Sequence, residues 1–443
     1  MKPARTLGFL LAWFMVLVLP VSGQFAGPAI LSRGEAPAAM ATPQISFRPF
    51  VGISALYNTG LAGVSVTSTG VIAHETSPGI LTHWGVGGTH SWRHTKVGLD
   101  YHGNFNYYSR TTYFTSLNHS LLLGVTHNFT RHIQLTLRES AGVFSRDFER
   151  TGLQQTVPFD PSTTYIPTTD YFDNRTYYMS SQADLTIQKS NRLSFNFGGD
   201  AYLARRRSAA LYGTTGLSAR GDVQYRLSRR NTIGAIYNYG NFRFTRVFGG
   251  SDVHGLAVSF ARALTARMEF SGFAGINRAE SEFLEVVAVD PVITALLGIT
   301  SGTRVSHSIL YAPLVGGRFS RTFARGVAYI GGGHAFTPGN GLFLTTAMTT
   351  GMAGYNYTGL RRWGLGTNVS YNRGTAYKPV ESVYASGSAS LNASRTLTQG
   401  LHLTFSYAVR RYLSPTLHTY NRTLYDASAG IAFSPGDIPL RFW

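Results

Sequence analysis

The stretch from Trp363 to Tyr371 constrains the fold more than any other part of this chain. It reads WGLGTNVSY, with Trp, Leu, Thr, Val and Tyr at alternate positions and Gly, Gly, Asn and Ser between them. Because side chains of a β-strand alternate between the two faces of its sheet, this pattern predicts a strand with one apolar and one small, polar face. The alternation returns at 97–107, 193–203 and 401–409. Each stretch has about the 9 to 11 residues that a tilted strand needs to cross a bilayer.

Alternating stretches recur along the chain after residue 44 and predict an all-β fold. We expect eighteen strands, or sixteen if the weakly patterned stretches 253–264 and 304–319 are wrongly divided. Such a set predicts a transmembrane antiparallel up-and-down β-barrel. A sheet edge left open to lipid would leave backbone groups unpaired, so the last strand should pair with the first. The expected strands are 45–57, 79–92, 96–108, 114–128, 132–145, 176–188, 192–205, 212–227, 231–245, 253–264, 267–278, 304–319, 325–336, 342–357, 362–375, 383–396, 400–413 and 421–434.

The expected connections alternate between short and long. Tight turns rich in Ser, Thr, Asn and Arg include Arg93–Thr95, Ser320–Thr322 and Gly359–Arg361. The connections between these turns vary in length, from the short segment 337–341 to the long segment 146–175. Outer-membrane barrels have short turns on the periplasmic side and longer loops outside, so the pattern predicts this orientation.

The N-terminal region predicts export. Residues 1–23 combine Lys2 and Arg5 with an apolar run and a small-residue end, as in a signal peptide. Residues 24–44 are rich in Ala, Pro and Gly and predict a flexible segment, and 45–443 is then the outer-membrane β-barrel. The chain has no cysteine, which excludes disulfides and thiolate metal sites.

Several other protein classes are disfavoured. No later segment has the apolar length of a membrane helix, and propeller blades would not need strands of this length. The 13 histidines are scattered, and no H-E-x-x-H or G-x-S-x-G motif occurs. We therefore expect no enzyme, no catalytic or metal site and no cofactor, although a Ser/His or Asp/His group at a barrel edge is left open. The net charge of +18 does not predict a nucleic-acid partner, because an exported chain leaves the cytoplasm.

Two turn-and-strand units, Tyr225–Tyr237 and Phe319–Tyr329, resemble those of porin-like outer-membrane β-barrels often linked to exopolysaccharide export. This resemblance implies a place in the outer membrane of a Gram-negative-type bacterium and possible polysaccharide-export partners. Such barrels usually end in a strand with a terminal aromatic residue. Here Trp443 is present, but 434–439 interrupts the strand, so 440–443 is expected to be a periplasmic tail that still signals to the barrel-assembly machinery.

The inward faces of the expected strands carry balanced charge, which predicts a hydrated passage with weak ion selectivity. Two arrangements stay open: the charges pair across the wall, or some form a selective constriction. The positive excess lies at the loop-side rim, as at Arg205, Arg206 and Arg207, where guanidinium groups can bind phosphates of outer-membrane lipid and lipopolysaccharide, or attract anionic solutes. The candidate pore-lining residues are Asp100, Asp184, Asp200, Asp222, Glu269 and Asp426, with Arg138, Arg220, Arg226, Arg243, Arg318 and Arg410.

Two long loops, 146–175 and 277–303, are long enough to fold inward, and either one is a candidate to narrow or plug the pore. Asp290 and Pro291 in the second loop predict the start of a short helix that runs to Leu297. The predicted function is an outer-membrane channel for solutes. The alternatives are an exopolysaccharide-secretion barrel and, with less support, a surface adhesin or a barrel enzyme; the sequence does not identify the solute.

Overall fold

The computed structural model describes residues 45–59, 76–109, 116–144, 175–207, 211–298, 300–337, 344–357, 359–376, 382–415, 421–435 and 438–440. The predicted signal peptide (1–23), the flexible segment (24–44) and loop 146–175 therefore lie outside the described residues, apart from Arg175. The strands in chain order are β1 (Ile45–Thr59), β2 (Thr76–Ser91), β3 (Thr95–Tyr108), β4 (Ser116–Asn128), β5 (Ile133–Phe144), β6 (Thr176–Gln188), β7 (Leu193–Arg206), β8 (Gly213–Arg226), β9 (Asn231–Thr245), β10 (Gly249–Thr265), β11 (Met268–Ala288), β12 (Ser301–Phe323), β13 (Gly326–Thr337), β14 (Thr346–Tyr357), β15 (Trp363–Ala376), β16 (Ser382–Thr398), β17 (Leu401–Leu413), β18 (Arg422–Phe433) and β19 (Ile438–Leu440).

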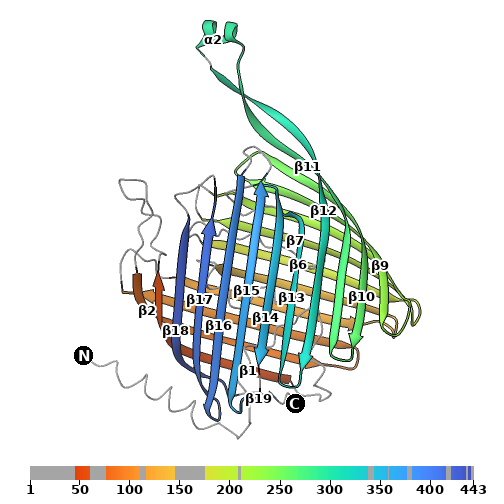
Figure 1. The fold of residues 1–443 in the computed structure, drawn as a ribbon, viewed down its shortest axis with the longest axis vertical. Helices are drawn as coiled ribbons and strands as arrows, with labels where there is room; N and C mark the ends of the chain where they lie inside the picture. Colours follow the sequence, from red (N-terminus) through yellow and green to blue (C-terminus); the bar gives the residue numbers. More distant parts are fainter. Residues whose placement is uncertain are drawn as a thin grey trace.

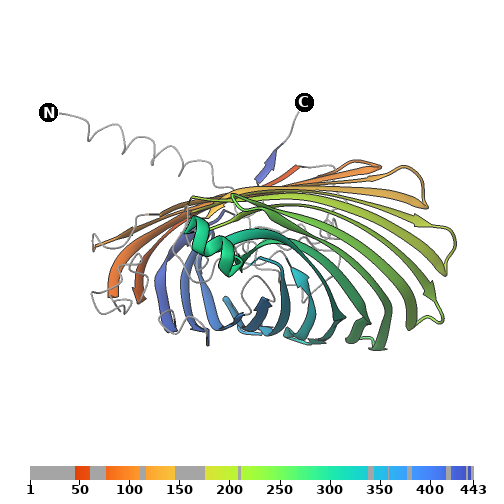
Figure 2. The same cartoon turned by 90° about the horizontal axis from the view of Figure 1, so that it is seen from above.

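The strands form one closed antiparallel barrel, as predicted. Each strand pairs with its neighbours in sequence, and β18 pairs with β1, so that Ser54 lies opposite Gly430. The short β19 follows an interruption after Phe433 and pairs with the first residues of β1. The barrel wall therefore has eighteen long strands, and β19 extends the last of them. Figure 1 shows β13–β18 in front and the steeply crossing N-terminal strands behind, and Figure 2 shows the flattened cross-section.

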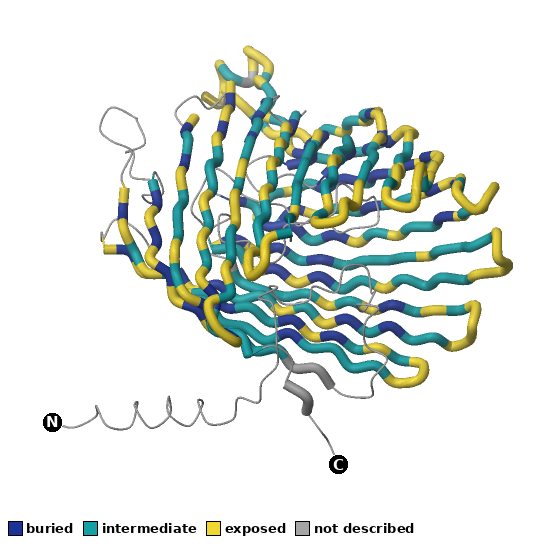
Figure 3. The backbone as a smooth tube through the Cα atoms, turned by 60° about the horizontal axis from the view of Figure 1, so that its bottom comes forward, coloured by how far each residue is buried: buried dark blue, intermediate teal, exposed yellow. Residues whose placement is uncertain are grey.

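The period-two pattern sets the two faces of the wall. In β15, Trp363, Val369 and Tyr371 are exposed on the outer face, with Val369 52 % exposed. The positions between them, such as Asn368 and Ser370, face the interior. Burial alternates along many strands in the same way (Figure 3). Large apolar side chains on the outside and small polar ones inside are the arrangement of a transmembrane barrel.

The predicted turns are confirmed except near residue 320. The turn expected at Ser320–Thr322 lies at 324–325, because β12 continues to Phe323 and Arg321 still pairs with Met268 of β11. The guanidinium carbon of Arg321 lies 4.7 Å from the centroid of the Phe323 ring, a contact that suits continued strand geometry. At the opposite rim only 246–248 separate β9 from β10, so this loop-side connection is shorter than predicted.

Loop 277–303 does not fold inward. Its described residues extend β11 and β12 into a hairpin that projects beyond the barrel rim and carries a short helix, α2 (Pro291–Leu297), at its tip (Figure 1). The predicted helix start is confirmed: the Asp290 side chain accepts a hydrogen bond from the Val292 amide, 2.8 Å, and Pro291 is the first helical residue. The hairpin projects because 21 residue pairs of β11 and β12, from Met268/Arg321 to Ala288/Ser301, stay in one ladder. Among the described residues, no helix is long and apolar enough to cross a membrane.

Candidate functional site on the inner wall

The pairing register shows which of the candidate pore-lining residues face the interior. Inward positions of neighbouring strands lie opposite each other: Asp184 on β6 faces Gly198 on β7, which faces Arg220 on β8. Following this face around the wall places eleven of the twelve candidates inside. They are Asp100, Arg138, Asp184, Asp200, Arg220, Asp222, Arg226, Glu269, Arg318, Arg410 and Asp426.

Arg243 is the exception and lies on the outer face. It pairs with Thr215 of β8 and Gly250 of β10, and Thr215 belongs to the same outer row as Met179, a 53 % exposed side chain. The inward positions beside it are Phe242 and Phe244. The sequence pattern was misleading here because two aromatic residues point inward at the loop end of β9, where the interior is apolar.

Six of the inward candidates lie on neighbouring strands β5 to β8, with Arg226 apart from the other five at the turn end of β8. Arg220 donates a hydrogen bond from Nη2 to Oδ1 of Asp184, 2.8 Å, and its Nε lies 3.6 Å from Oδ2 of Asp222. Arg138 approaches the same carboxylate from the other side, with Nη2 3.8 Å from Oδ2 of Asp184. The charged side chains therefore pair with partners on the same strand or on nearby strands, along one wall of the barrel.

Gly198 makes the central pair possible. Asp184 and Arg220 sit on strands that are not adjacent, and β7 runs between them. A Cβ atom added at Gly198 would lie 2.5 Å from Oδ1 of Asp184 and 3.2 Å from Nη2 of Arg220. Only a residue without a side chain leaves room for the ion pair to cross the strand.

Neighbouring polar side chains complete this network. Asp222 accepts hydrogen bonds from Nδ2 of Asn196, 2.7 Å, and Nε2 of Gln224, 3.2 Å. Asp200 accepts a hydrogen bond from the Ser218 hydroxyl. With two arginines against three aspartates, this part of the wall has a small acidic excess.

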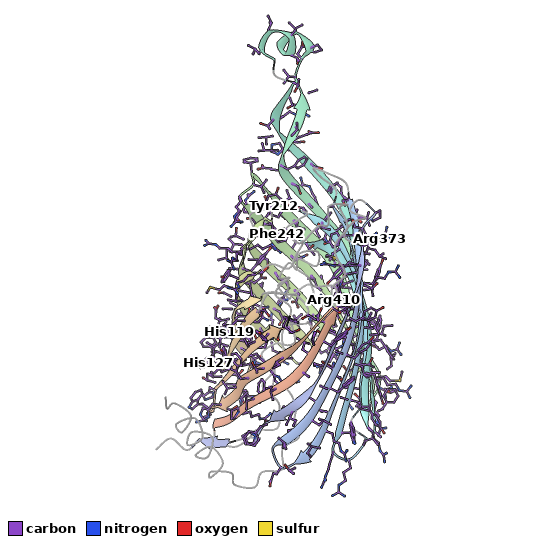
Figure 4. The ribbon with its side chains drawn as sticks, turned by 90° about the vertical axis from the view of Figure 1, so that its left-hand side faces the viewer. His119, His127, Tyr212, Phe242, Arg373 and Arg410 are labelled. Carbon is purple, nitrogen blue, oxygen red and sulfur yellow. The ribbon has the colours of Figure 1, made fainter. Side chains whose placement is uncertain are left out.

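The other inward candidates are separate from this network. Asp100 lies 3.0 Å from Nδ1 of His102. Nη1 of Arg410 donates to the Tyr412 hydroxyl, 3.0 Å, and the Arg410 side chain points into the barrel (Figure 4). Asp426 accepts a hydrogen bond from Nδ2 of Asn58, 3.1 Å. The guanidinium carbon of Arg318 lies 5.9 Å from the centroid of the Tyr329 ring. Glu269 and Arg226 are exposed near the turns.

Strands β15 to β18 form a wall of a different kind. Their inward side chains are mostly Ser, Asn and Thr, and they hydrogen-bond to each other across the strands. The Ser370 and Ser388 hydroxyls are 2.6 Å apart, as are those of Ser406 and Ser428. The interior therefore has a charged, ion-paired wall on β5–β8 and a hydroxyl-rich wall on β15–β18, in which the inward positions of β15 and β16 are uncharged while Arg410 and Asp426 lie on β17 and β18.

The interior differs between its two ends. Near the short turns, inward side chains such as Glu269, Ser271 and Asn392 are exposed. Near the loops, inward tyrosines are almost fully buried, and Tyr384 and Tyr412 are 1 % and 2 % exposed. The passage is thus open to solvent at the turn end and becomes narrower toward the loop end.

Part of this narrowing comes from the loop-side ends of β13 and β14. The β12–β13 ladder reaches only to Val315 and His334, although β12 continues to pair with β11. Past this point Phe336 packs with Val253, Ala279 and Ala312, which lie on inward positions of β10, β11 and β12. The ends of the β13–β14 hairpin therefore turn into the barrel.

Polar contacts fix this inward turn. The Ser251 hydroxyl of β10 is hydrogen-bonded to the Ser281 hydroxyl of β11, 2.6 Å, and to the hydroxyl of Thr345, which directly precedes β14. Leu344 lies beside Phe244 and Phe283. Sequence reasoning missed this constriction because it treated 337–341 as a minimal connection. The inward aromatic residues Phe242 and Phe244 were the available signal.

Within the described residues, no group of three or more His, Asp or Glu side chains is placed to hold a metal ion. No family model matches this chain, and no curated protein is similar to it in sequence. Solved structures with a similar barrel include Pseudomonas aeruginosa OccK5 (OpdH), with 12 % identity over 89 % of this chain and 98 % of that chain, TM-score 0.42. P. aeruginosa OccK2 (OpdF) in complex with glucuronate has 11 % identity over 89 % and 98 %, TM-score 0.42. The copper transporter OprC has 12 % identity over 88 % and 66 %, TM-score 0.44.

Proposed function

We propose that this protein is a gated diffusion channel of the bacterial outer membrane. The observation that carries the proposal is the exposed polar lining at the turn end of an eighteen-strand barrel, shown by Glu269, Ser271 and Asn392. Barrels of 16 to 18 strands leave room for an aqueous passage. The proposal includes the barrel-assembly machinery and outer-membrane lipid as partners and assigns no catalysis to the chain.

The gate in this proposal is the inward-turned end of β13 and β14. Phe336 and Leu344 hold it against the inner wall through apolar contacts, and Thr345 holds it through Ser251. Apolar packing and a hydroxyl contact are weak enough to separate without unfolding the barrel. Conductance should therefore be low when this segment is seated and higher when it is displaced.

Current through planar bilayers tests the proposal. The double variant Phe336→Ala, Leu344→Ala should conduct more than the wild-type protein, because it removes the apolar contacts of the gate. The matched control is Phe405→Ala, Leu391→Ala, which removes side chains of the same types from the outer face. A folded barrel that stays non-conducting in the wild-type form and in the gate variant would exclude the channel.

The uncharged inner face of β15 and β16 favours uncharged, hydroxylated solutes as cargo. Side chains such as Ser388, Ser390 and Asn392 can donate and accept hydrogen bonds without a charge preference. This observation also supports the second candidate function, export of a polysaccharide. Neutral oligosaccharides added on the turn side should then block the current of the gate variant more strongly than anionic ones of equal length. If neutral and anionic oligosaccharides block the current equally, the proposed preference for uncharged solutes is contradicted.

A further inference from the structure

The outer face of β6 to β9 carries a groove of ≈ 380 Å³. Two neighbouring outward rows form it. Ser181, Ala201 and Leu217 belong to one row, and Met179, Leu203 and Thr215 belong to the next. Small side chains at Ser181, Ala201 and Thr215 lie between larger ones, so the face is hollowed where an outer barrel wall is usually convex.

The chemistry of the groove changes along its length. Met179 and Leu217 are 53 % and 60 % exposed, which makes its walls apolar. Its β9 end is polar, because Asn241 and Arg243 continue the two rows there. An occupant needs a hydrocarbon part for the apolar walls and an anionic or strongly polar group at the β9 end.

The guanidinium group of Arg243 lies at that end, and its N–H donors are not all used by Asp252. Its Nη2 lies 3.7 Å from Oδ2 of Asp252, longer than a charge-assisted hydrogen bond. Asp252 itself accepts hydrogen bonds from Asn241, 2.6 Å, and Tyr239, 2.8 Å. The Arg243 side chain is 51 % exposed, so guanidinium donors remain available to a ligand.

A second guanidinium group, that of Arg205, lies beyond the loop-side end of the groove. Arg205 is exposed on the outer face of β7, one outward position beyond Leu203, and pairs in register with Tyr177. Neighbouring strands lie about 4.8 Å apart, so Arg205 on β7 and Arg243 on β9 are separated by roughly two strand spacings. Together with Asp252 they leave one net positive charge at the loop-side end of the apolar wall, where lipid headgroups lie.

We propose that this groove binds a phosphorylated, multiply acylated glycolipid of the outer leaflet, of the lipid A type. One acyl chain lies across β6–β9, and headgroup phosphates contact Arg205 and Arg243. Guanidinium groups match phosphate through paired N–H donors, and the loop side is the outer side of the membrane. The inference rests on the proposed outer-membrane location but does not depend on conduction.

Native mass spectrometry of the purified barrel with lipid A tests the site. We expect one bound lipid A, and at least tenfold weaker binding in Arg205→Gln, Arg243→Gln and in Ala201→Phe, which fills the groove. The matched controls are Arg373→Gln and Ala389→Phe, outward residues of β15 and β16. Figure 4 shows Arg373 on the opposite side of the barrel. The controls should bind as the wild-type protein does.

The outcomes separate this proposal from its alternatives. Unchanged binding in both groove variants, or an equal loss in the controls, would overturn the site. Equal binding of phosphatidylglycerol, with the same dependence on both arginines, would overturn the choice of lipid A. Conductance measured on the same samples is expected to stay unchanged in the groove variants, so failure of the lipid site and failure of the channel are distinguishable.

Discussion

Arg220 and Asp184 meet across an intervening strand, with Nη2 of Arg220 2.8 Å from Oδ1 of Asp184. Both side chains are about 15 % exposed, and Gly198 of β7 lies between them. An ion pair that spans two strand spacings ties β6, β7 and β8 together on the inner face. It also makes one backbone position of the middle strand intolerant of any side chain.

Replacing this glycine should disrupt the pair. In Gly198→Ala the new Cβ would displace the Asp184 carboxylate, and the lost charge-assisted hydrogen bond should cost about 1.5 to 3 kcal/mol of unfolding free energy. Urea unfolding of the barrel in lipid vesicles measures this loss of unfolding free energy. The control is Gly199→Ala, on the outer face of the same strand, where the nearest atom to an added Cβ is at 3.5 Å. Equal stability of the two variants would contradict this role of Gly198.

The two faces of β15 should respond in opposite ways to an arginine. Val369 is outward and Asn368 inward, so Val369→Arg should cost about 2 to 4 kcal/mol in the bilayer while Asn368→Arg is tolerated by a wet interior. The same unfolding assay compares the variants. Similar damage at both positions would mean that the interior is not hydrated there.

Glu139 is an acidic side chain on the outer face of β5. It lies opposite Leu123 and Ser181, and Oε2 accepts a hydrogen bond from the Ser181 hydroxyl, 2.6 Å. Charges on a lipid-exposed face are unfavourable, with acids costing less than the 2 to 4 kcal/mol of a basic residue, so Glu139→Leu should stabilise the barrel by roughly 1 to 2 kcal/mol. Glu269→Leu, at an exposed inward position, serves as the control and should change stability little. A destabilised Glu139→Leu barrel would indicate that protein or water covers this residue.

The charged wall should set ion selectivity. Arg138→Gln, Arg220→Gln leaves Asp184 and Asp222 without their cations, so the open channel should favour K⁺ over Cl⁻. Asp184→Asn, Asp222→Asn should shift the preference toward Cl⁻. Reversal potentials under a KCl gradient, measured in the gate variant, give the direction. Arg373→Gln on the outer face should leave the reversal potential where it was.

Orientation in the membrane can be tested with epitope tags. A tag after Gly298, which has open space around it beyond α2, should be reached by antibodies on intact cells, and a tag at Gly359 should not. The expected strands 231–245 and 253–264 left Gly250 and Ser251 in a loop between them, but both residues lie in β10 and Ser251 is buried. Labelling at Gly359 on intact cells would reverse the proposed orientation.

The amino-acid sequence alone determined the two faces of most strands and limited their number to sixteen to eighteen. Alternation such as that from Trp363 to Tyr371 is a local property, because successive side chains of an extended backbone must point to opposite sides. The helix start at Asp290 and Pro291 was also local, since the cap and the fixed backbone angle of proline act within one turn. Closure of the barrel followed because no backbone group can stay unpaired in lipid.

The tertiary structure decided which side chains meet and where the interior is narrow. Arg138 and Arg220 share the Asp184 carboxylate because of strand register and of the gap left by Gly198, and neither can be derived from one strand. Arg243 lies outside, and Phe242 inside, because the end of β13 and β14 turns inward and gives that part of the interior an apolar surface. Alternation defines two faces of a strand, but only the distant segment that covers one face determines whether it meets water, lipid or protein.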